Sequence, residues 1–274
     1  MKAASAALSS TLTDLPPQRA GIQSVEVGFS LLQVLAASPG ALMLRDLAAA
    51  AGMNAAKAHR YLVSFQRLGL VTQDAVSTRY DLGPAALKLG LASLSRLDYV
   101  KLARQRLPPL QEQIGQTLAL GVWGNQGPTL VHWEESPQAI TINLRLGDVM
   151  PLLSSATGLC FLAFLPAHRL AGLLQDELAR AQKLGRRDVP TSMAELHTLL
   201  DEVRRRGLAR VVDGLLPGMA GFCAPVFDAG GHLVLGMVAL GSLATFDPAW
   251  DGAVARPLAA AARLLSSDLG FSGA

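Results

Sequence analysis

The sequence predicts an α+β protein of two domains, in which a small helix-turn-helix with a wing precedes a larger mixed domain. The length of 274 residues exceeds the usual size of a single domain. Two short helical patterns meet at Gly52, and two short strand patterns follow them. After Pro109, strand-like runs and helical patterns come in an order that favours a central antiparallel sheet with helices packed against it.

Positive charge is concentrated in the first third of the chain. Residues 1–90 hold 8 Lys and Arg against 5 Asp and Glu, whereas residues 91–274 hold 16 of each kind. No acidic residue occurs between Leu47 and Gln73, although three Lys or Arg do. A short helix that keeps cations and excludes acids is typical of a surface that meets phosphates and base edges. The stretch 44–82 therefore predicts DNA binding.

The composition is that of a soluble cytoplasmic protein. Half of the residues are apolar and 16% are charged. Cys160 and Cys223 lie in apolar surroundings, so we expect buried thiols in a reducing compartment. We expect no membrane span and no signal peptide, because no apolar run approaches about 20 residues and the N-terminus lacks a continuous apolar segment. Residues 1–20, rich in Ala, Ser and Thr, predict a flexible tail.

Three helices and a two-stranded wing are predicted in the N-terminal part. Ser24 is the expected N-cap of the first helix, and Asn54 that of the third. Gly52 lies in the turn between the second and the third. The first predicted helix starts near residue 24 and is stopped by Ser38-Pro39-Gly40, the other two cover about residues 44–51 and 55–68, and the predicted strands cover 70–72 and 79–82.

A long helix is predicted over about residues 84–107. Gly83-Pro84 opens it, and Pro108-Pro109 should interrupt it, because an interior proline removes a backbone hydrogen bond. Since a continuous helix can act as a strut, we place the domain boundary in it. The predicted organisation is a tail (1–20), a winged helix-turn-helix domain (21–83), a linker helix (84–109) and a second domain (110–274).

The second domain is predicted to mix strands and helices. Asp228-Ala229-Gly230-Gly231 is a good signal for a hairpin turn between the last two strands. The expected strands cover about residues 118–123, 129–133, 140–144, 221–227 and 233–240. The expected helices cover about residues 157–165, 168–181, 193–206 and 248–269.

Six blocks of sequence, in order along the chain, resemble the IclR-type bacterial regulators. Together they span nearly the whole chain. The blocks are GIQSVEVGFSLLQVL (Gly21–Leu35), LRDLAAAAGMNAAKAHRYLVSFQRLGLV (Leu44–Val71), RYDLGPAALKLG (Arg79–Gly90), MPLLSSATGLCFLAFLP (Met150–Pro166), RRRGLAR (Arg204–Arg210) and PGMAGFCAPVFDAGGHLV (Pro217–Val234).

This resemblance implies a winged helix-turn-helix, a linker helix and a C-terminal effector-binding domain with a GAF/PAS-like antiparallel sheet and flanking helices. It also implies a double-stranded DNA operator, a small-molecule effector and a homodimer or tetramer as partners. Some members repress, some activate and some do both. In this family, small organic acids or aromatic metabolites alter the binding of the regulator to DNA or to RNA polymerase.

The residues expected to meet DNA are those of the helix-turn-helix and the wing. Lys57 and Arg60 share the polar face of the third helix, and Arg79 at the base of the wing suits a phosphate or the minor groove. The alternative for these cations is a merely solvated basic face, and His59 has a packing role between helices as its alternative. The full predicted set is Arg45, Asn54, Lys57, His59, Arg60 and Arg79.

The chain departs from the family pattern in both domains. The third helix of the family usually begins with a polar or basic residue followed by Ser and Thr. Here those positions hold Ala55, Ala56 and Lys57, which reduces direct base readout by hydroxyl groups. In the second domain only Asp213 remains of an acidic cluster, and Gly221 falls near the usual Cys. Fewer polar groups imply an effector more apolar than a two-carbon acid, and we expect an aromatic or longer aliphatic carboxylate.

The expected effector site centres on the strand-to-helix junction at residues 154–158. An ordinary helix cap explains part of this pattern, but the same positive helix end can receive a carboxylate. Asp213 is either a turn former or a ligand gate. The full predicted set is Ser154, Ser155, Ala156, Thr157, Gly158, Asp213, Cys223 and Ser242.

An enzyme acting on a small organic acid in the second domain, with the first as a tether, is the alternative function. His132 and Glu134 would share one face of a strand, with Trp133 on the other. No metal-spaced His pair, nucleophile elbow, P-loop or dinucleotide-binding pattern accompanies them, so we expect no catalytic residue, metal or cofactor. Arg204-Arg205-Arg206 is expected to be a helix end whose dipole favours cations.

Overall fold

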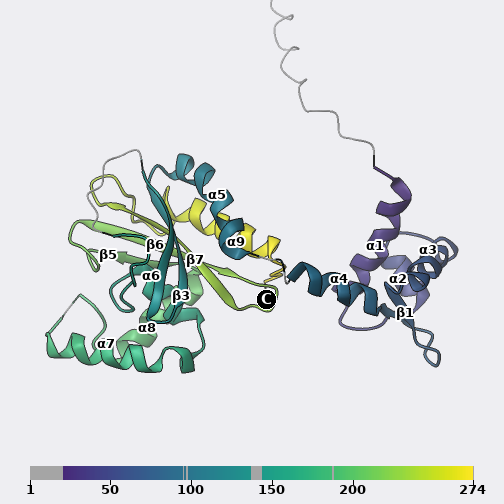
Figure 1. The fold of residues 1–274 in the computed structure, drawn as a ribbon, viewed down its shortest axis with the longest axis horizontal. Helices are drawn as coiled ribbons and strands as arrows, with labels where there is room; N and C mark the ends of the chain where they lie inside the picture. Colours follow the sequence, from purple (N-terminus) through teal and green to yellow (C-terminus); the bar gives the residue numbers. More distant parts are fainter. Residues whose placement is uncertain (1–20, 95, 97, 137–143, 187, 274) are drawn as a thin grey trace, which may run out of the picture. The chain divides into compact units, whose positions relative to one another are not determined.

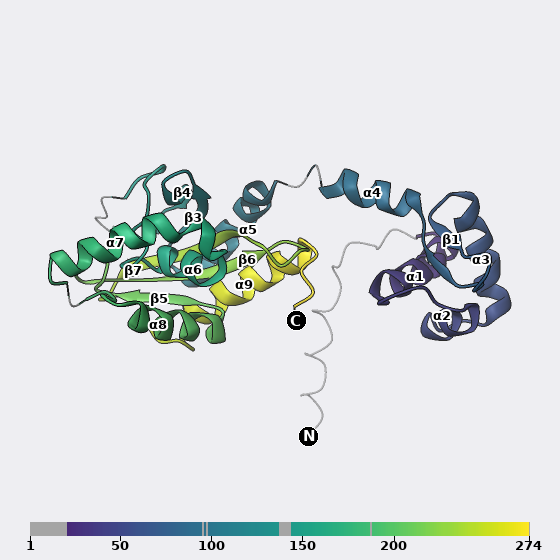
Figure 2. The same cartoon turned by 90° about the horizontal axis from the view of Figure 1, so that it is seen from below.

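The computed structural model describes residues 21–94, 96, 98–136, 144–186 and 188–273 (Figures 1 and 2). The chain divides into two compact units, which meet in sequence between Leu97 and Asp98. The predicted tail and most of the predicted strand at residues 140–144 lie outside the described residues. In the described part of the chain, no helix combines the length and apolar character that crossing a lipid bilayer requires.

The first unit is a three-helix cluster with a short hairpin. Its helices are α1 (Gln23–Ala37), α2 (Leu44–Ala50) and α3 (Ala55–Arg67), and Leu31, Leu47 and Leu62 are fully buried among them. The prediction that Ser24 caps α1 is wrong. The helix begins one residue earlier, and the residue at its N-cap position, Ile22, makes no side-chain hydrogen bond to the helix.

The wing consists of β1 (Val71–Gln73) and β2 (Tyr80–Leu82), which pair antiparallel. Tyr80 is buried, and its backbone exchanges hydrogen bonds of 2.8 and 2.9 Å with Leu42 in the loop before α2. These bonds fix the wing to the helical cluster.

Two helices follow the wing where the sequence predicts one. They are α4 (Pro84–Leu94) and α5 (Tyr99–Ile114), and α5 runs through Pro108 and Pro109. The predicted interruption is therefore wrong. Both prolines are exposed, so water can reach the carbonyls that they leave without a partner, whereas Leu107 and Leu110 are buried on the other side of the helix.

The second unit is built on one antiparallel sheet in the order β4-β3-β7-β6-β5. The predicted hairpin turn connects β6 to β7, where the Asp228 carboxylate accepts the amides of Gly230 and His232. The short edge strand β5 was not predicted. The strands are β3 (Thr117–Gly124), β4 (Gly127–Glu134), β5 (Ala209–Val212), β6 (Met219–Phe227) and β7 (Leu233–Ser242).

Helices cover both faces of this sheet. α5 and α9 (Ala255–Asp268) pack together on one face (Figure 1), and α6 (Ala156–Phe164) covers the other. Behind α6 lie the one-turn helix η1 (Ala167–Arg169), α7 (Ala171–Lys183) and α8 (Met193–Arg206). Figure 2 shows α8 beside the edge strand β5.

Two of these helices begin later than predicted. η1 takes up residues 167–169, so α7 starts at Ala171. α9 starts at Ala255 instead of residue 248, because the Asp247 carboxylate accepts the amides of Ala249 and Ala253 and holds the preceding residues in a turn.

Candidate nucleic-acid interface and ligand cavity

The helix-turn-helix presents α3 on a rigid support. Gly52 adopts a positive φ of 66° in the turn after α2, a conformation that glycine tolerates best. The Asn54 side chain then accepts the amide of Lys57 at 2.8 Å, which confirms the predicted cap. Ala58 and Leu62 are fully buried against the other helices, so the opposite side of α3 is fixed toward solvent.

The residues predicted to meet DNA lie mostly on that solvent side. Arg60 and His59 are exposed, so the alternative in which His59 packs between helices is not what the structure has. Lys57 is half-buried, and Arg45 is exposed in the first turn of α2. Asn54 is exposed, but its side-chain oxygen is already occupied by the cap.

The wing places its one cation against the helical cluster. The loop of the hairpin is held by the Asp74 carboxylate, which accepts the amide of Ser77 at 2.7 Å and its hydroxyl at 2.8 Å. These bonds lower the pKa of Asp74 below its ordinary value. Arg79 is exposed, and one guanidinium N–H donates to the carbonyl of Ala41 at 3.1 Å, which leaves its other donors available.

The second unit contains a cavity where α6 begins. Its volume is about 40 Å³, room for a few water molecules. Of the predicted effector residues, Ser155, Ala156 and Thr157 line it. The remaining lining is almost wholly apolar and comes from Leu144, Met150, Val211, Leu215, Leu216, Met219, Ala220, Gly221, Val238 and Leu240.

The two hydroxyl groups at the start of α6 differ in what they already bind. The Ser155 hydroxyl donates to the carbonyl of Pro151 at 2.6 Å and accepts the amide of Gly158 at 2.8 Å, so it is the helix cap. Thr157 has its methyl group against Gly121, where an added Cβ would come within 2.7 Å of it. Its hydroxyl has no hydrogen-bond partner among the described residues and is the one left for a ligand at this helix end.

The other predicted effector residues do not line this cavity. Gly158 lets α6 approach the chain before it, since a Cβ there would lie 2.1 Å from the Pro151 carbonyl. The Asp213 carboxylate accepts the amide of Gly218 at 2.6 Å, as a turn former does. Ser154 lines a neighbouring cleft, and Ser242 ends β7 opposite Met219.

Cys223 is fully buried between the sheet and α6. Burial is the main cause that raises the pKa of its thiol well above the ordinary value, and contact with Cys160 adds to the effect. A neutral, buried thiol is a packing group.

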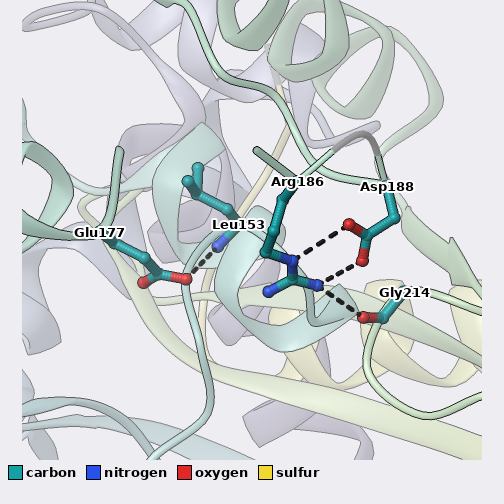
Figure 3. Close-up of polar contacts among 5 residues, drawn as sticks. All are labelled: Leu153, Glu177, Arg186, Asp188 and Gly214. Carbon is teal, nitrogen blue, oxygen red and sulfur yellow. Dashed lines mark hydrogen bonds and ion pairs between the residues drawn. The ribbon is translucent and has the colours of Figure 1, made fainter. Parts of the chain in front are cut away.

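Two charged residues that the sequence did not indicate brace the walls of the cavity. Figure 3 shows Glu177 of α7 reaching the chain before α6, where its carboxylate accepts the amide of Leu153 at 3.0 Å. The same carboxylate also accepts the amide of Leu152 at 2.8 Å. Arg186 donates to both carboxylate oxygens of Asp188, which raises the pKa of Arg186, and also to the carbonyl of Gly214 at 3.4 Å.

This brace joins segments that are far apart in sequence. Glu177 holds the chain that leads into Ser155, and Arg186 holds the loop that carries Leu215 and Leu216. No local sequence pattern predicts such contacts, because the two partners of each hydrogen bond are 24 to 28 residues apart in the chain.

His132 and Glu134 are paired on β4, as their spacing predicts. The His132 Nε2 and Glu134 Oε1 atoms are 2.8 Å apart. Neither residue lines the cavity at α6. Within the described ranges, no group of three or more His, Cys, Asp or Glu side chains is arranged to hold a metal ion.

Both units match models of one family. Residues 24–75 match the IclR helix-turn-helix domain, and residues 91–267 match the C-terminal domain of the bacterial transcriptional regulator IclR. The second match alone covers more than half of the chain.

Individual relatives agree with these matches. The glycerol operon regulatory protein of Streptomyces griseus is 33% identical over 253 residues, which cover 91% of this chain and 97% of that protein. The regulator KdgR of Escherichia coli is 26% identical, with 94% and 97% covered.

A solved structure shows the same architecture. The crystal structure of Pseudomonas aeruginosa HmgR has a TM-score of 0.85 and 38% identity, with 92% of this chain and 100% of that chain covered. The fold and family expected from the sequence are thereby confirmed, and the two relatives from Streptomyces griseus and Escherichia coli are described as regulatory proteins. The chain belongs to the IclR family of bacterial transcriptional regulators.

Proposed function

We propose that this regulator responds to a small carboxylate with an aromatic or longer aliphatic body, bound in the cavity at the start of α6. The observation that carries the proposal is the distribution of polarity around the cavity. The start of α6 supplies Thr157 and the positive end of the helix dipole, whereas the other walls are almost wholly apolar. One charged end and one hydrocarbon body match that distribution.

The geometry at α6 supports a carboxylate at the helix end. The Thr157 hydroxyl is a donor without a partner among the described residues, and the Ser155 hydroxyl is already committed to capping. The hydrocarbon part would then lie against Leu215, Val238 and Leu240. Burying it there contributes roughly 25 cal/mol per Å² of apolar surface removed from water.

The size of the cavity supports a coupled movement. Since its volume is about 40 Å³, an acid with an aromatic ring enters only if part of the wall moves. The loop at residues 213–218 is the candidate, because Leu216 is 37% exposed and Asp213 holds a positive φ of 58°. A movement of this loop changes the Arg186–Gly214 contact and so reaches α7.

We further propose that the protein acts in the cytoplasm as a homodimer or tetramer on a double-stranded operator. Exposed apolar side chains support a partner surface in the first unit. They are Ile22 at the N-cap of α1 with Val25 and Phe29 on that helix, at spacings of three and four residues, and Leu87 and Leu91 on α4. Effector binding would shift the population of placements in which paired units engage two half-sites.

A ligand screen tests the effector class. We expect benzoate or hexanoate, and not glyoxylate or pyruvate, to raise the melting temperature. Calorimetric affinity for the active acid should fall about tenfold in Thr157→Val, since one hydrogen bond to a charged group is removed. The control Thr198→Val removes a hydroxyl of α8 that bonds only to its own helix.

Two outcomes of this screen would contradict the proposal. Stabilisation by glyoxylate or pyruvate alone would contradict the apolar-body proposal, and equal loss in both variants would remove Thr157 from the site. Mass spectrometry of the acid after incubation distinguishes sensing from catalysis, because a sensor returns its ligand intact.

A further inference from the structure

An arginine-lined cleft lies away from the cavity at α6. Its volume is about 540 Å³, and the C-terminal end of α8 and the first half of α9 line it (both helices are labelled in Figure 2). Among its described lining residues Asp251 is the one acid, against four arginines: Arg205, Arg206, Arg256 and Arg263.

One side of this cleft is a prearranged wall. The guanidinium carbon of Arg206 lies 4.3 Å from the centroid of the Trp250 ring, and that of Arg210, which does not line the cleft, lies 4.2 Å from it. Arg206 also pairs with Glu202 at 3.0 Å, and Arg210 donates to the carbonyl of Pro248 at 3.0 Å. Stacking and pairing reduce the freedom of both side chains.

Intramolecular contacts account for the last-turn cations of α8 only in part. Arg204 pairs with Asp201 at 2.8 Å and donates to the carbonyl of Ala163 at 2.9 Å, and Arg206 has the contacts above. Arg205 has neither an ion pair nor a side-chain hydrogen bond among the described residues. The helix dipole explains why a cation is tolerated there but gives it no partner.

Arg256 and Arg263 on α9 are likewise without ion pairs in the described part of the chain. Arg256 lies in the first turn, the helix end at which the dipole disfavours a cation. No side chain caps this end. Of the two carboxylates that precede it, that of Asp247 is bound to the amides of Ala249 and Ala253, and Asp251 lines the cleft. The cleft lining thus holds four arginines against one carboxylate, that of Asp251, and Glu202 pairs with only one of the arginines, Arg206.

The spacing on α9 indicates the shape of the missing anion. Arg256 and Arg263 are seven residues apart, about 10 Å along the helix axis and on one face. The cleft residues between them, Ala259 and Ala260, have small side chains that leave room. Two guanidinium groups at this separation reach around an extended anion better than around a single phosphate or carboxylate, and guanidinium forks match phosphate oxygens.

We propose that this cleft binds a compact ligand with two or more linked phosphate groups, such as a nucleoside di- or triphosphate. The site is separate from the effector cavity at α6, so the regulator has a second small-molecule input. A DNA backbone carries the same phosphates, but they follow a convex surface, whereas a concave cleft suits a small molecule.

Titration calorimetry with inorganic triphosphate and with ATP, at about 0.15 M salt to screen distant charges, tests the proposal. We expect saturable binding to the full-length protein, weakened at least tenfold in Arg256→Gln/Arg263→Gln. The control Arg169→Gln removes an exposed arginine of η1 that does not line the cleft, and it should bind as the unaltered protein does. Tighter binding of ATP than of triphosphate would assign a role to the nucleoside.

Three results would overturn the proposal. The first is that neither probe binds saturably, and the second is that Arg169→Gln loses as much affinity as the double variant. The third is that the protein binds a non-operator DNA duplex instead of either probe, and that Arg256→Gln/Arg263→Gln weakens this DNA binding. If circular dichroism shows that the double variant does not fold, the single variant Arg205→Gln takes its place, and we expect it to bind the probes at least tenfold more weakly as well. Thr157→Val should leave this binding unchanged, so failure at either site is distinguishable.

Discussion

Arg60 is exposed on the solvent side of α3, and the buried residues Ala58 and Leu62 fix the orientation of that side. Its guanidinium has no intramolecular ion pair among the described residues and is available for a phosphate. Arg79, by contrast, already donates to Ala41, so part of its hydrogen-bonding capacity serves the fold. These two cations therefore differ in what their removal should do.

We expect Arg60→Ala to weaken operator binding without lowering stability. The slope of log affinity against log salt should become shallower by about 0.9 for each lost phosphate contact. A fluorescence-anisotropy titration at several salt concentrations measures this, with Arg180→Ala in the second unit as the control for lost charge. An unchanged slope would remove Arg60 from the interface.

Residue roles could be predicted from the sequence where they depend on neighbours along the chain. The Asn54 cap and the Asp228 turn are confirmed, because each is made within a few residues. Cys223 was predicted at the effector site, but sheet pairing and burial against Cys160 place it away from the cavity lining. Glu177 and Arg186 were missed because their partners are distant in sequence.

Most helices and strands followed their patterns with errors at their ends, but the predicted linker helix is two helices, α4 and α5, and the strand β5 was missed. α8 runs over residues 193–206 as predicted, since Ser192 caps it and Gly207 ends it in a left-handed conformation. The predicted interruption of the helix at Pro108-Pro109 was wrong, because the sequence alone did not show that both prolines lie on the side of α5 that faces water. The short strand β5 has too few residues to show a period.

The contact between α7 and the chain before α6 has a measurable strength. Glu177→Ala leaves the amides of Leu152 and Leu153 without their acceptor, and we expect a loss of roughly 1–3 kcal/mol in the free energy of unfolding. Urea denaturation followed by tryptophan fluorescence reports the second unit alone, because all three tryptophans lie in it. An equal loss in the exposed neighbour Asp176→Ala would contradict this role.

The turn of the wing should loosen in acid. Hydrogen bonds from Ser77 lower the pKa of Asp74, so their stabilisation is present above the unfolded pKa of about 3.9 and is lost as pH falls through the lower folded pKa. We expect the NMR signal of the Ser77 amide to shift in that acid range. In Asp74→Asn, which keeps an acceptor oxygen but does not titrate, the shift should vanish; its persistence would exclude Asp74 as the cause.

At the scale of the whole molecule, the proposed homo-oligomer would need apolar surfaces that a single chain leaves exposed. Phe29 on α1 is 53% exposed, next to Ile22 and Val25 on the same face. We expect Phe29→Glu to reduce the molar mass measured by light scattering after gel filtration. The control Val76→Glu also replaces an exposed apolar side chain with a carboxylate, at a wing position that is 93% exposed, and it should leave the molar mass unaltered. Unchanged mass in both variants would place the interface elsewhere.

Ala55 and Ala56 open α3 with side chains that end at Cβ, and both are exposed. Because neither contributes to the core, the amino acids there can change without a cost in packing. We therefore expect a library of polar residues at these two positions to change which operator sequences the protein prefers without lowering its stability.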